Sequence, residues 1–134
     1  MSGELAEHAT RAIAAINSRD PELIAAAFDP LAEIHTGRNT YLGVEAAIGW
    51  AEKRYDHLDR RYTIAATHTR GEAVLVLGTV EYVWREEGEV GDSAPIALKL
   101  EFAGGRVRTL TVADDPEAAL EAFESLPLGR SGAS

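Results

Sequence analysis

The sequence predicts an α+β domain in which helices pack on one face of an antiparallel β-sheet. Three stretches with helical spacing of apolar residues come first, and an unbroken series of strand-like segments and one short helix follow. The spacing of apolar residues changes to a period of two near residue 60. Helices separated along the chain from a run of strands are typical of this class, and the arrangement often encloses a cavity.

Amphipathic spacing predicts each of the first three helices. Apolar residues recur at helical intervals over residues 4–17. Residues 20–22 (Asp-Pro-Glu) supply an N-cap, a first-turn proline and a first-turn acid for a short second helix, which we expect to end at Pro30. A third helix follows Gly43 and extends to Tyr55.

Alternation of apolar and polar residues predicts the strands. Two short ones, residues 32–36 and 40–42, pair around a Gly-Arg-Asn turn. Four longer ones follow, at residues 61–69, 73–84, 96–102 and 107–112.

The first long hairpin decides which side chains share a face. A two-residue loop at Arg70 and Gly71 would place Thr69 opposite Glu72. One face, expected to line the cavity, then carries Tyr62, Ile64, Leu75, Leu77, Thr79 and Glu81. The other face carries Val74, Val76, Val80, Tyr82 and Trp84.

Both faces of the strand at 73–84 are largely apolar, so both should be covered. The helices can cover one of them. We therefore expect a homodimer through the back of the sheet, with an interface formed by Val74, Val76, Val80, Tyr82 and Trp84.

Two different loops could precede the last strand, and the loop decides which side chains of that strand face inward. A two-residue loop at Gly104 and Gly105 would turn Val107, Thr109 and Thr111 inward. A three-residue loop with a bulge would turn Arg108, Leu110 and Val112 inward.

The end of the chain predicts one more helix. Asp115 is the expected N-cap of a helix over residues 115–126, and residues 128–134 are expected to form a flexible tail. A chain of 134 residues is expected to fold as one domain, over residues 1–127.

Composition restricts the partners. The net charge of −9 argues against nucleic acid and anionic membranes as partners, because both require a basic face. Cysteine is absent, so thiolate chemistry is excluded. The N-terminus has no basic region followed by an apolar stretch, so we expect a cytoplasmic protein. No metal-ligand spacing and no phosphate-binding loop is present, and no cofactor is expected.

Three segments resemble the nuclear transport factor 2-like superfamily, in particular its SnoaL-like and ketosteroid-isomerase-like members. They are A-I-A-A-I-N-S-R-D-P-E-L-I-A-A-A-F-D-P at 12–30, Y-L-G-V-E-A-A-I at 41–48 and L-E-F-A-G-G-R-V-R at 100–108. The resemblance covers about residues 5–115. It implies a cystatin-like cone: a curved, mainly antiparallel sheet with the first three helices on its concave face around an apolar pocket.

The resemblance also implies which chemistry is missing. The oxyanion-hole and base positions of ketosteroid isomerases fall on Ala12, Leu98 and a position near Thr36, which lack the required groups. The acid of limonene-epoxide-hydrolase-like members falls on Val112. The likeness favours Arg108, Leu110, Val112 and Asp114 as pocket-facing residues.

His35 and Asp114 are the candidate catalytic residues, as a general base and an acid or base at the pocket mouth. The simpler interpretations are a strand-end histidine and a helix-start acid. Glu81 and Arg108 could instead form a buried ion pair. The expected ligand-binding residues are Tyr41, Trp50, Tyr62, Thr79, Glu81, Leu98, Phe102 and Arg108.

Two functions follow. The first is a cofactor-free isomerase, cyclase or dehydratase that acts by general acid–base catalysis on a small hydrophobic molecule bearing oxygen. The second is a non-catalytic binding or dimerisation module of the same fold.

Overall fold

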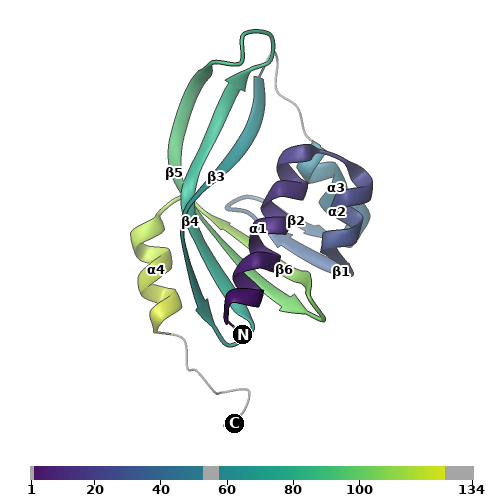
Figure 1. Ribbon diagram of the computed structural model, residues 1–134, viewed down its shortest axis with the longest axis vertical. Helices are drawn as coiled ribbons and strands as arrows, with labels where there is room; N and C mark the ends of the chain where they lie inside the picture. Colours follow the sequence, from purple (N-terminus) through teal and green to yellow (C-terminus); the bar gives the residue numbers. More distant parts are fainter. Residues whose placement is uncertain (1, 53–57, 126–134) are drawn as a thin grey trace.

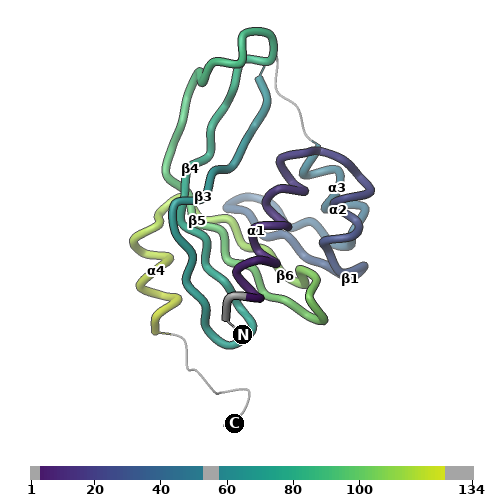
Figure 2. Tube along the Cα trace, in the orientation of Figure 1, coloured from purple at the N-terminus to yellow at the C-terminus, as the bar shows by residue number. Residues whose placement is uncertain are grey.

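The computed structural model describes residues 2–52 and 58–125 of the chain (Figures 1 and 2). The expected end of the third helix at Tyr55 and the expected tail at 128–134 lie outside these residues. The elements follow one another in the order α1 (Ser2–Ser18), α2 (Pro21–Ala27), β1 (Phe28–His35), β2 (Thr40–Leu42), α3 (Val44–Glu52), β3 (Leu58–Arg70), β4 (Ala73–Trp84), β5 (Val90–Ala103), β6 (Arg106–Ala113) and α4 (Pro116–Glu124).

The strands form one six-stranded, curved sheet in the order β2-β1-β6-β5-β4-β3. β1 and β6 run parallel, and the other neighbours run antiparallel. Figure 1 shows α1, α2 and α3 on the concave face of the sheet. This confirms the predicted α+β class and the placement of the first three helices.

The last helix, α4, packs against the opposite face of the sheet (Figure 1), where no helix was expected. Its apolar side buries Phe123, with Leu120 and Ala119 beside it, against Leu75 and Ala97. The outer face of the sheet, which a partner subunit was expected to cover, is thus covered in part by the chain itself.

Local chemistry explains the starts of the short helices. Asp20 Oδ1 accepts a hydrogen bond from Glu22 N–H at 2.9 Å, and Asp115 Oδ1 accepts one from Ala118 N–H at 3.2 Å. Both residues are N-caps followed by a proline, as predicted.

The second helix ends three residues before the predicted point. It stops at Ala27, and Pro30 lies inside β1. Proline has no N–H to donate to a neighbouring strand. Pro30 falls in the stretch between Phe28 and Glu33 where the pairing of β1 with β6 is interrupted, so that missing donor leaves no gap in the ladder.

The predicted register of the β3–β4 hairpin is wrong. Arg70 pairs with Ala73, and Thr69 therefore faces Val74 instead of Glu72. A bulge between Ile64 and Ala66 then shifts the pairing by one residue, because an extra residue in one strand reverses its alternation. Beyond the bulge, Tyr62 pairs with Val80.

This bulge explains why the predicted faces of β4 are exchanged. Val74, Val76 and Val80 are buried in the core beneath the helices, with exposed fractions of 0%, 1% and 6%. They cannot form the expected dimer interface. Tyr82 also packs against this core, and only Trp84 of the proposed set is exposed. The homodimer itself stays a prediction.

The last strand has both features that were expected as alternatives, the two-residue loop and the bulge. Ala103 pairs with Arg106, so the loop is the two-residue Gly104-Gly105 turn. A bulge follows, because Phe102 pairs with Val107 but Glu101 pairs with Thr109. Leu110 and Val112 consequently belong to the core under the helices, as the resemblance implied.

Within the described residues, no helix has both the length and the apolar character needed to cross a membrane.

Candidate functional site

A cleft opens at one end of the concave face, between α3, the loop after β1 and the strands β3 to β6. Its volume is about 340 Å³, within the range of roughly 300–1,000 Å³ that is typical of small-molecule sites. The residues that line it are Thr36, Gly37, Arg38, Asn39, Tyr41, Trp50, Arg60, Tyr62, Val80, Tyr82, Ile96, Val112 and Asp114.

The inner wall of the cleft is aromatic. Trp50 of α3 and Tyr62 of β3 stack with ring centroids 6.3 Å apart and planes inclined by 22°. Both side chains are almost fully buried, at 4% and 5% exposure. Tyr62 reaches this position because the bulge in β3 turns it toward the helices together with Val80.

Arg60 lies against these two rings. Its Cζ is 4.5 Å from the ring centroid of Trp50 and 5.5 Å from that of Tyr62, which are cation–π distances. Its Nη2 also donates a hydrogen bond to the main-chain oxygen of Trp50 at 2.8 Å. The guanidinium is therefore held in one place by α3 and β3 together.

The rim of the cleft is a turn shaped by Thr36. Its hydroxyl oxygen accepts hydrogen bonds from the main-chain N–H groups of Arg38 and Asn39, at 3.3 and 3.0 Å. The Thr36 N–H also donates to the main-chain oxygen of Asn39 at 2.9 Å. These bonds fix the turn that closes one side of the opening.

Asp114 is the carboxylate of the cleft. It follows the last residue of β6 and precedes Asp115, whose side chain caps α4. The two adjacent acids thus have different tasks: Asp115 holds the helix, and Asp114 lines the cleft.

The structure brings some of the predicted ligand-binding residues together and separates others. Tyr41, Trp50 and Tyr62 line the cleft. Leu98 and Phe102 lie in the core, and Phe102 is near His8 of α1, with ring centroids 5.9 Å apart.

The three polar candidates from the strands lie elsewhere. Glu81 accepts two hydrogen bonds from Arg61, at 2.6 and 3.1 Å, so the alternative Glu81–Arg108 ion pair is wrong. Arg108 donates to the main-chain oxygen of Leu31 at 3.1 Å. Thr79, like Glu81, alternates along β4 with the cleft-lining Val80 and so faces away from the cleft.

His35 lies beside the cleft and is not among its lining residues. Its Nε2 is 3.1 Å from Glu33 Oε1, and its Nδ1 is 3.3 Å from Thr40 Oγ1. The ring is thus already engaged on both nitrogens, and its role in proton transfer stays a prediction.

Sequence reasoning missed Arg60 and misplaced Tyr82. Arg60 precedes Tyr62 by two residues in the same strand, so the alternation that turned Tyr62 inward also indicates an inward Arg60. The predicted strand began at Arg61, three residues after the start of β3 at Leu58, and this signal was lost. Tyr82 was assigned to the back of the sheet because the bulge was not foreseen.

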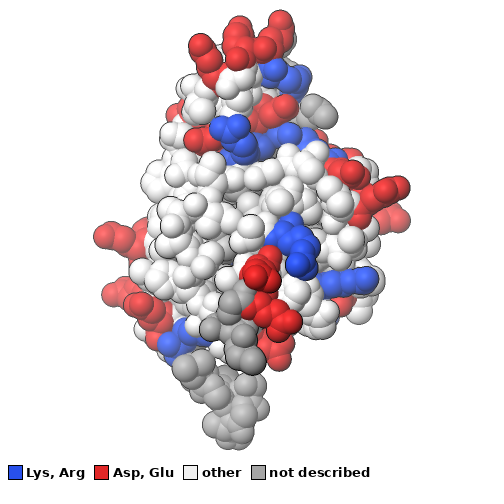
Figure 3. Space-filling view, in the orientation of Figure 1, with Lys and Arg blue, Asp and Glu red and all other residues white. Residues whose placement is uncertain are grey.

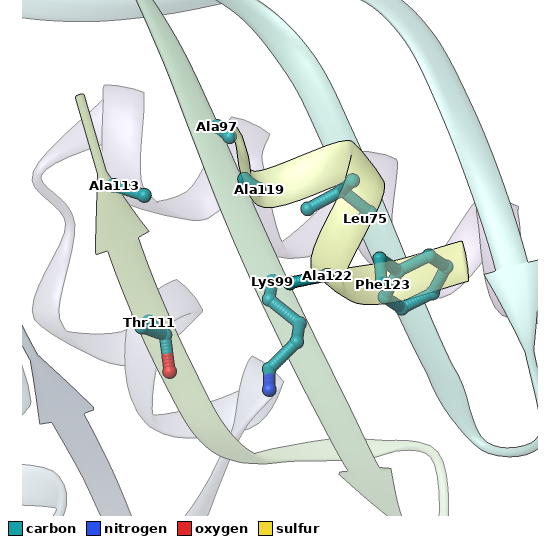
Figure 4. A pocket seen from close by; sticks show the side chains of 8 residues that line it. All are labelled: Leu75, Ala97, Lys99, Thr111, Ala113, Ala119, Ala122 and Phe123. Atoms are coloured by element: carbon teal, nitrogen blue, oxygen red, sulfur yellow. The ribbon is translucent and has the colours of Figure 1, made fainter. Parts of the chain in front are cut away.

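A second, smaller hollow lies under α4 on the other face of the sheet (Figure 4). Its volume is about 200 Å³, below the usual range of ligand sites. Alanines form much of its wall, and Figure 4 shows them together with Leu75, Phe123, Lys99 and Thr111.

Acidic side chains gather on several parts of the surface. Figure 3 shows acidic side chains at the tip formed by the β4–β5 turn and along the side of the molecule where α4 lies. In the described part of the chain, no three His, Asp or Glu residues are placed to share a metal ion.

Comparison with solved structures identifies the architecture. An NTF2-like protein of unknown function from Burkholderia pseudomallei K96243 has a TM-score of 0.69 and 18% identity, with 88% of this chain and 95% of that chain covered. A protein of Jannaschia sp. CCS1 described as a SnoaL-like polyketide cyclase has a TM-score of 0.70 and 14% identity, with 94% and 95% covered. The chain has the nuclear transport factor 2-like fold.

Another similar solved structure is that of TerC, co-crystallised with polyporic acid. It has a TM-score of 0.70 and 20% identity, with 91% of this chain and 99% of that chain covered. At these identities the likeness establishes the fold and leaves the activity open. No protein-family model matches the sequence, and no curated protein matches it either.

Proposed function

We propose that this chain binds a small apolar molecule bearing one or two oxygen atoms in the cleft. The observation that carries the proposal is the composition of the wall: four aromatic rings and three aliphatic side chains form one part of it, and polar and charged side chains form the rest. Such a wall holds the apolar part of a ligand against the rings and orients its oxygen atoms through the polar contacts. The co-crystallisation of TerC with polyporic acid supports the use of this fold for small molecules.

The two tryptophans allow a direct test. Trp50 lines the cleft and Trp84 lies at the exposed end of β4, so an amide-correlation NMR spectrum of the labelled chain reports on both places through two indole signals. A Trp84→Phe variant assigns them. On titration with 2-naphthol, a neutral planar probe, the Trp50 signal should shift in a saturable manner and the Trp84 signal should not.

Two matched variants locate the binding. Val112 lines the cleft and Val90 is exposed on β5 outside it. Val112→Phe should weaken binding of 2-naphthol at least about tenfold, because the added ring occupies the space that the ligand needs. Val90→Phe should have no effect. If the Trp50 signal does not move at millimolar 2-naphthol, the proposal fails.

A second candidate function is proton transfer by Asp114. The observation that favours it is the one carboxylate among the described residues that line the cleft, where it could remove a proton next to a carbonyl group. Isomerisation, cyclisation and dehydration all include such a step. No ketosteroid isomerase activity is expected, because Ala12 and Leu98 are buried apolar residues that offer no side-chain hydrogen bond to an enolate.

This second function can be tested without knowing the substrate. A general base in the cleft should catalyse exchange of the acidic protons of 2-tetralone with deuterated water, which NMR follows directly. Asp114→Asn should abolish the protein-dependent rate. An equal rate for the wild type and Asp114→Asn would leave the chain as a binding module.

A further inference from the structure

Arg60 is a buried cation. Its exposed fraction is 9%, and it is the only charged residue that is buried in the described part of the chain. A buried charge is costly unless it is paired and hydrogen-bonded. The side chain therefore needs an explanation that packing alone does not give.

The partners of Arg60 use only a small part of its hydrogen-bonding capacity. A guanidinium has five N–H donors. One hydrogen bond, from Nη2 to the main-chain oxygen of Trp50, accounts for one of them. Across residues 2–52 and 58–125, the ion pairs of Asp59, Glu81 and Glu33 are made with other cations, and none joins a carboxylate to Arg60.

The remaining edge of Arg60 faces the cleft, because the residue is part of the cleft wall. Its position over Trp50 and Tyr62 holds the planar guanidinium against the rings. A planar ligand in the cleft would meet the aromatic wall and the guanidinium at the same time. Arginine in this arrangement binds a carboxylate through two parallel hydrogen bonds.

The charge of the cleft also favours an anion. Its charged lining residues are two guanidinium groups, Arg38 and Arg60, and one carboxylate, Asp114. The whole chain, by contrast, carries a net charge of −9. The cleft is thus a locally basic site on an acidic protein.

We propose that the ligand is a planar aromatic or conjugated acid whose carboxylate binds Arg60. This inference rests on the proposed function and adds the class of the ligand to it. Trp50 and Tyr62 supply the stacking wall, and the carboxylate of the ligand supplies to Arg60 the counter-charge that the described residues do not provide.

The test compares two probes of the same shape. 2-Naphthoate carries the carboxylate, and 2-naphthamide replaces it with a neutral amide. Both are titrated against the wild type and followed through the Trp50 indole signal. 2-Naphthoate should bind at least about tenfold more tightly, because a hydrogen bond to a charged group is worth more than one to a neutral group.

Two arginine variants give the matched control. Arg60 and Arg61 are neighbours in β3, but Arg61 is paired with Glu81 outside the cleft. Arg60→Met should abolish the preference for 2-naphthoate, Arg60→Lys should keep part of it, and Arg61→Met should leave it unchanged.

The outcomes separate the two proposals. If both probes bind the wild type equally, or if the preference survives in Arg60→Met, the anion inference is overturned while ligand binding stands. If neither probe moves the Trp50 signal, the proposed function fails as well. Should Arg60→Met not fold, the wild-type comparison and Arg60→Lys still decide the question.

Discussion

The side-chain amide of Asn17 is hydrogen-bonded to both main-chain polar groups of Tyr62. Its Nδ2 donates to the Tyr62 oxygen, and its Oδ1 accepts from the Tyr62 N–H, each at 2.8 Å. β3 is an edge strand, and a strand edge presents polar groups that no further strand pairs. Asn17 therefore attaches α1 to the sheet at the residue whose ring lines the cleft.

Replacing Asn17 with alanine should lower the free energy of unfolding by about 1–3 kcal/mol, because two hydrogen bonds are lost at once. Urea unfolding followed by tryptophan fluorescence measures this. Thr10→Ala is the control: its hydroxyl bonds only the Ala6 oxygen on the exposed side of α1, so its effect should stay within about 0.5 kcal/mol. Equal stabilities of the two variants would contradict this role of Asn17.

Gly78 allows the close approach of β3 at its bulge. A Cβ at this position would lie 1.8 Å from the main-chain oxygen of Thr63, which is backbone and cannot move aside easily. Gly78→Ala should therefore destabilise the fold by about 3 kcal/mol or more. Gly49→Ala is the matched control, because Gly49 lies in α3 with no atom near the added Cβ.

Gly49→Ala should stabilise the chain by about 0.5–1 kcal/mol through its higher helix propensity. Opposite signs for the two glycine substitutions in thermal unfolding would support the register described above. A neutral effect of Gly78→Ala would mean that the bulge is not formed in solution.

Substitutions of the two neighbouring acids at the start of α4 should change the free energy of unfolding by different amounts. Asp115→Ala removes the N-cap hydrogen bond to Ala118 and should cost about 1 kcal/mol. Asp114→Ala removes no cap and should change stability by less than about 0.5 kcal/mol. A larger loss of stability for Asp114→Ala than for Asp115→Ala in denaturant unfolding would show that Asp115 is not the cap of α4.

Features set by short-range chemistry could be predicted from the sequence. The Asp-Pro-Glu starts of α2 and α4 depend on neighbouring residues, and both N-caps are found where the sequence placed them. The resemblance in three short segments indicated the curved sheet and the three helices on its concave face. An amphipathic α4 was also foreseen, but its pattern says only that one side is buried and not against which face.

The faces of β4 could not be predicted from one hairpin. The face of one residue predicts the faces of the residues paired beyond it only while the pairing is regular. A single bulge near Ala65 exchanges the two faces. The local signal was Gly78, a glycine inside a long strand, which often marks a bulge or a close backbone approach. The same bulge hid Tyr82, whereas Arg60 was missed because the predicted strand began at Arg61.

The position of a bound ligand tests the central claim most directly. Intermolecular nuclear Overhauser effects between the ring protons of 2-naphthol and the chain would show which wall it touches. Contacts with Trp50, Tyr62 and the methyl groups of Val112 are predicted, because these residues line the cleft. Contacts with Ala119 and Phe123 instead would place the ligand in the hollow under α4 and contradict the account.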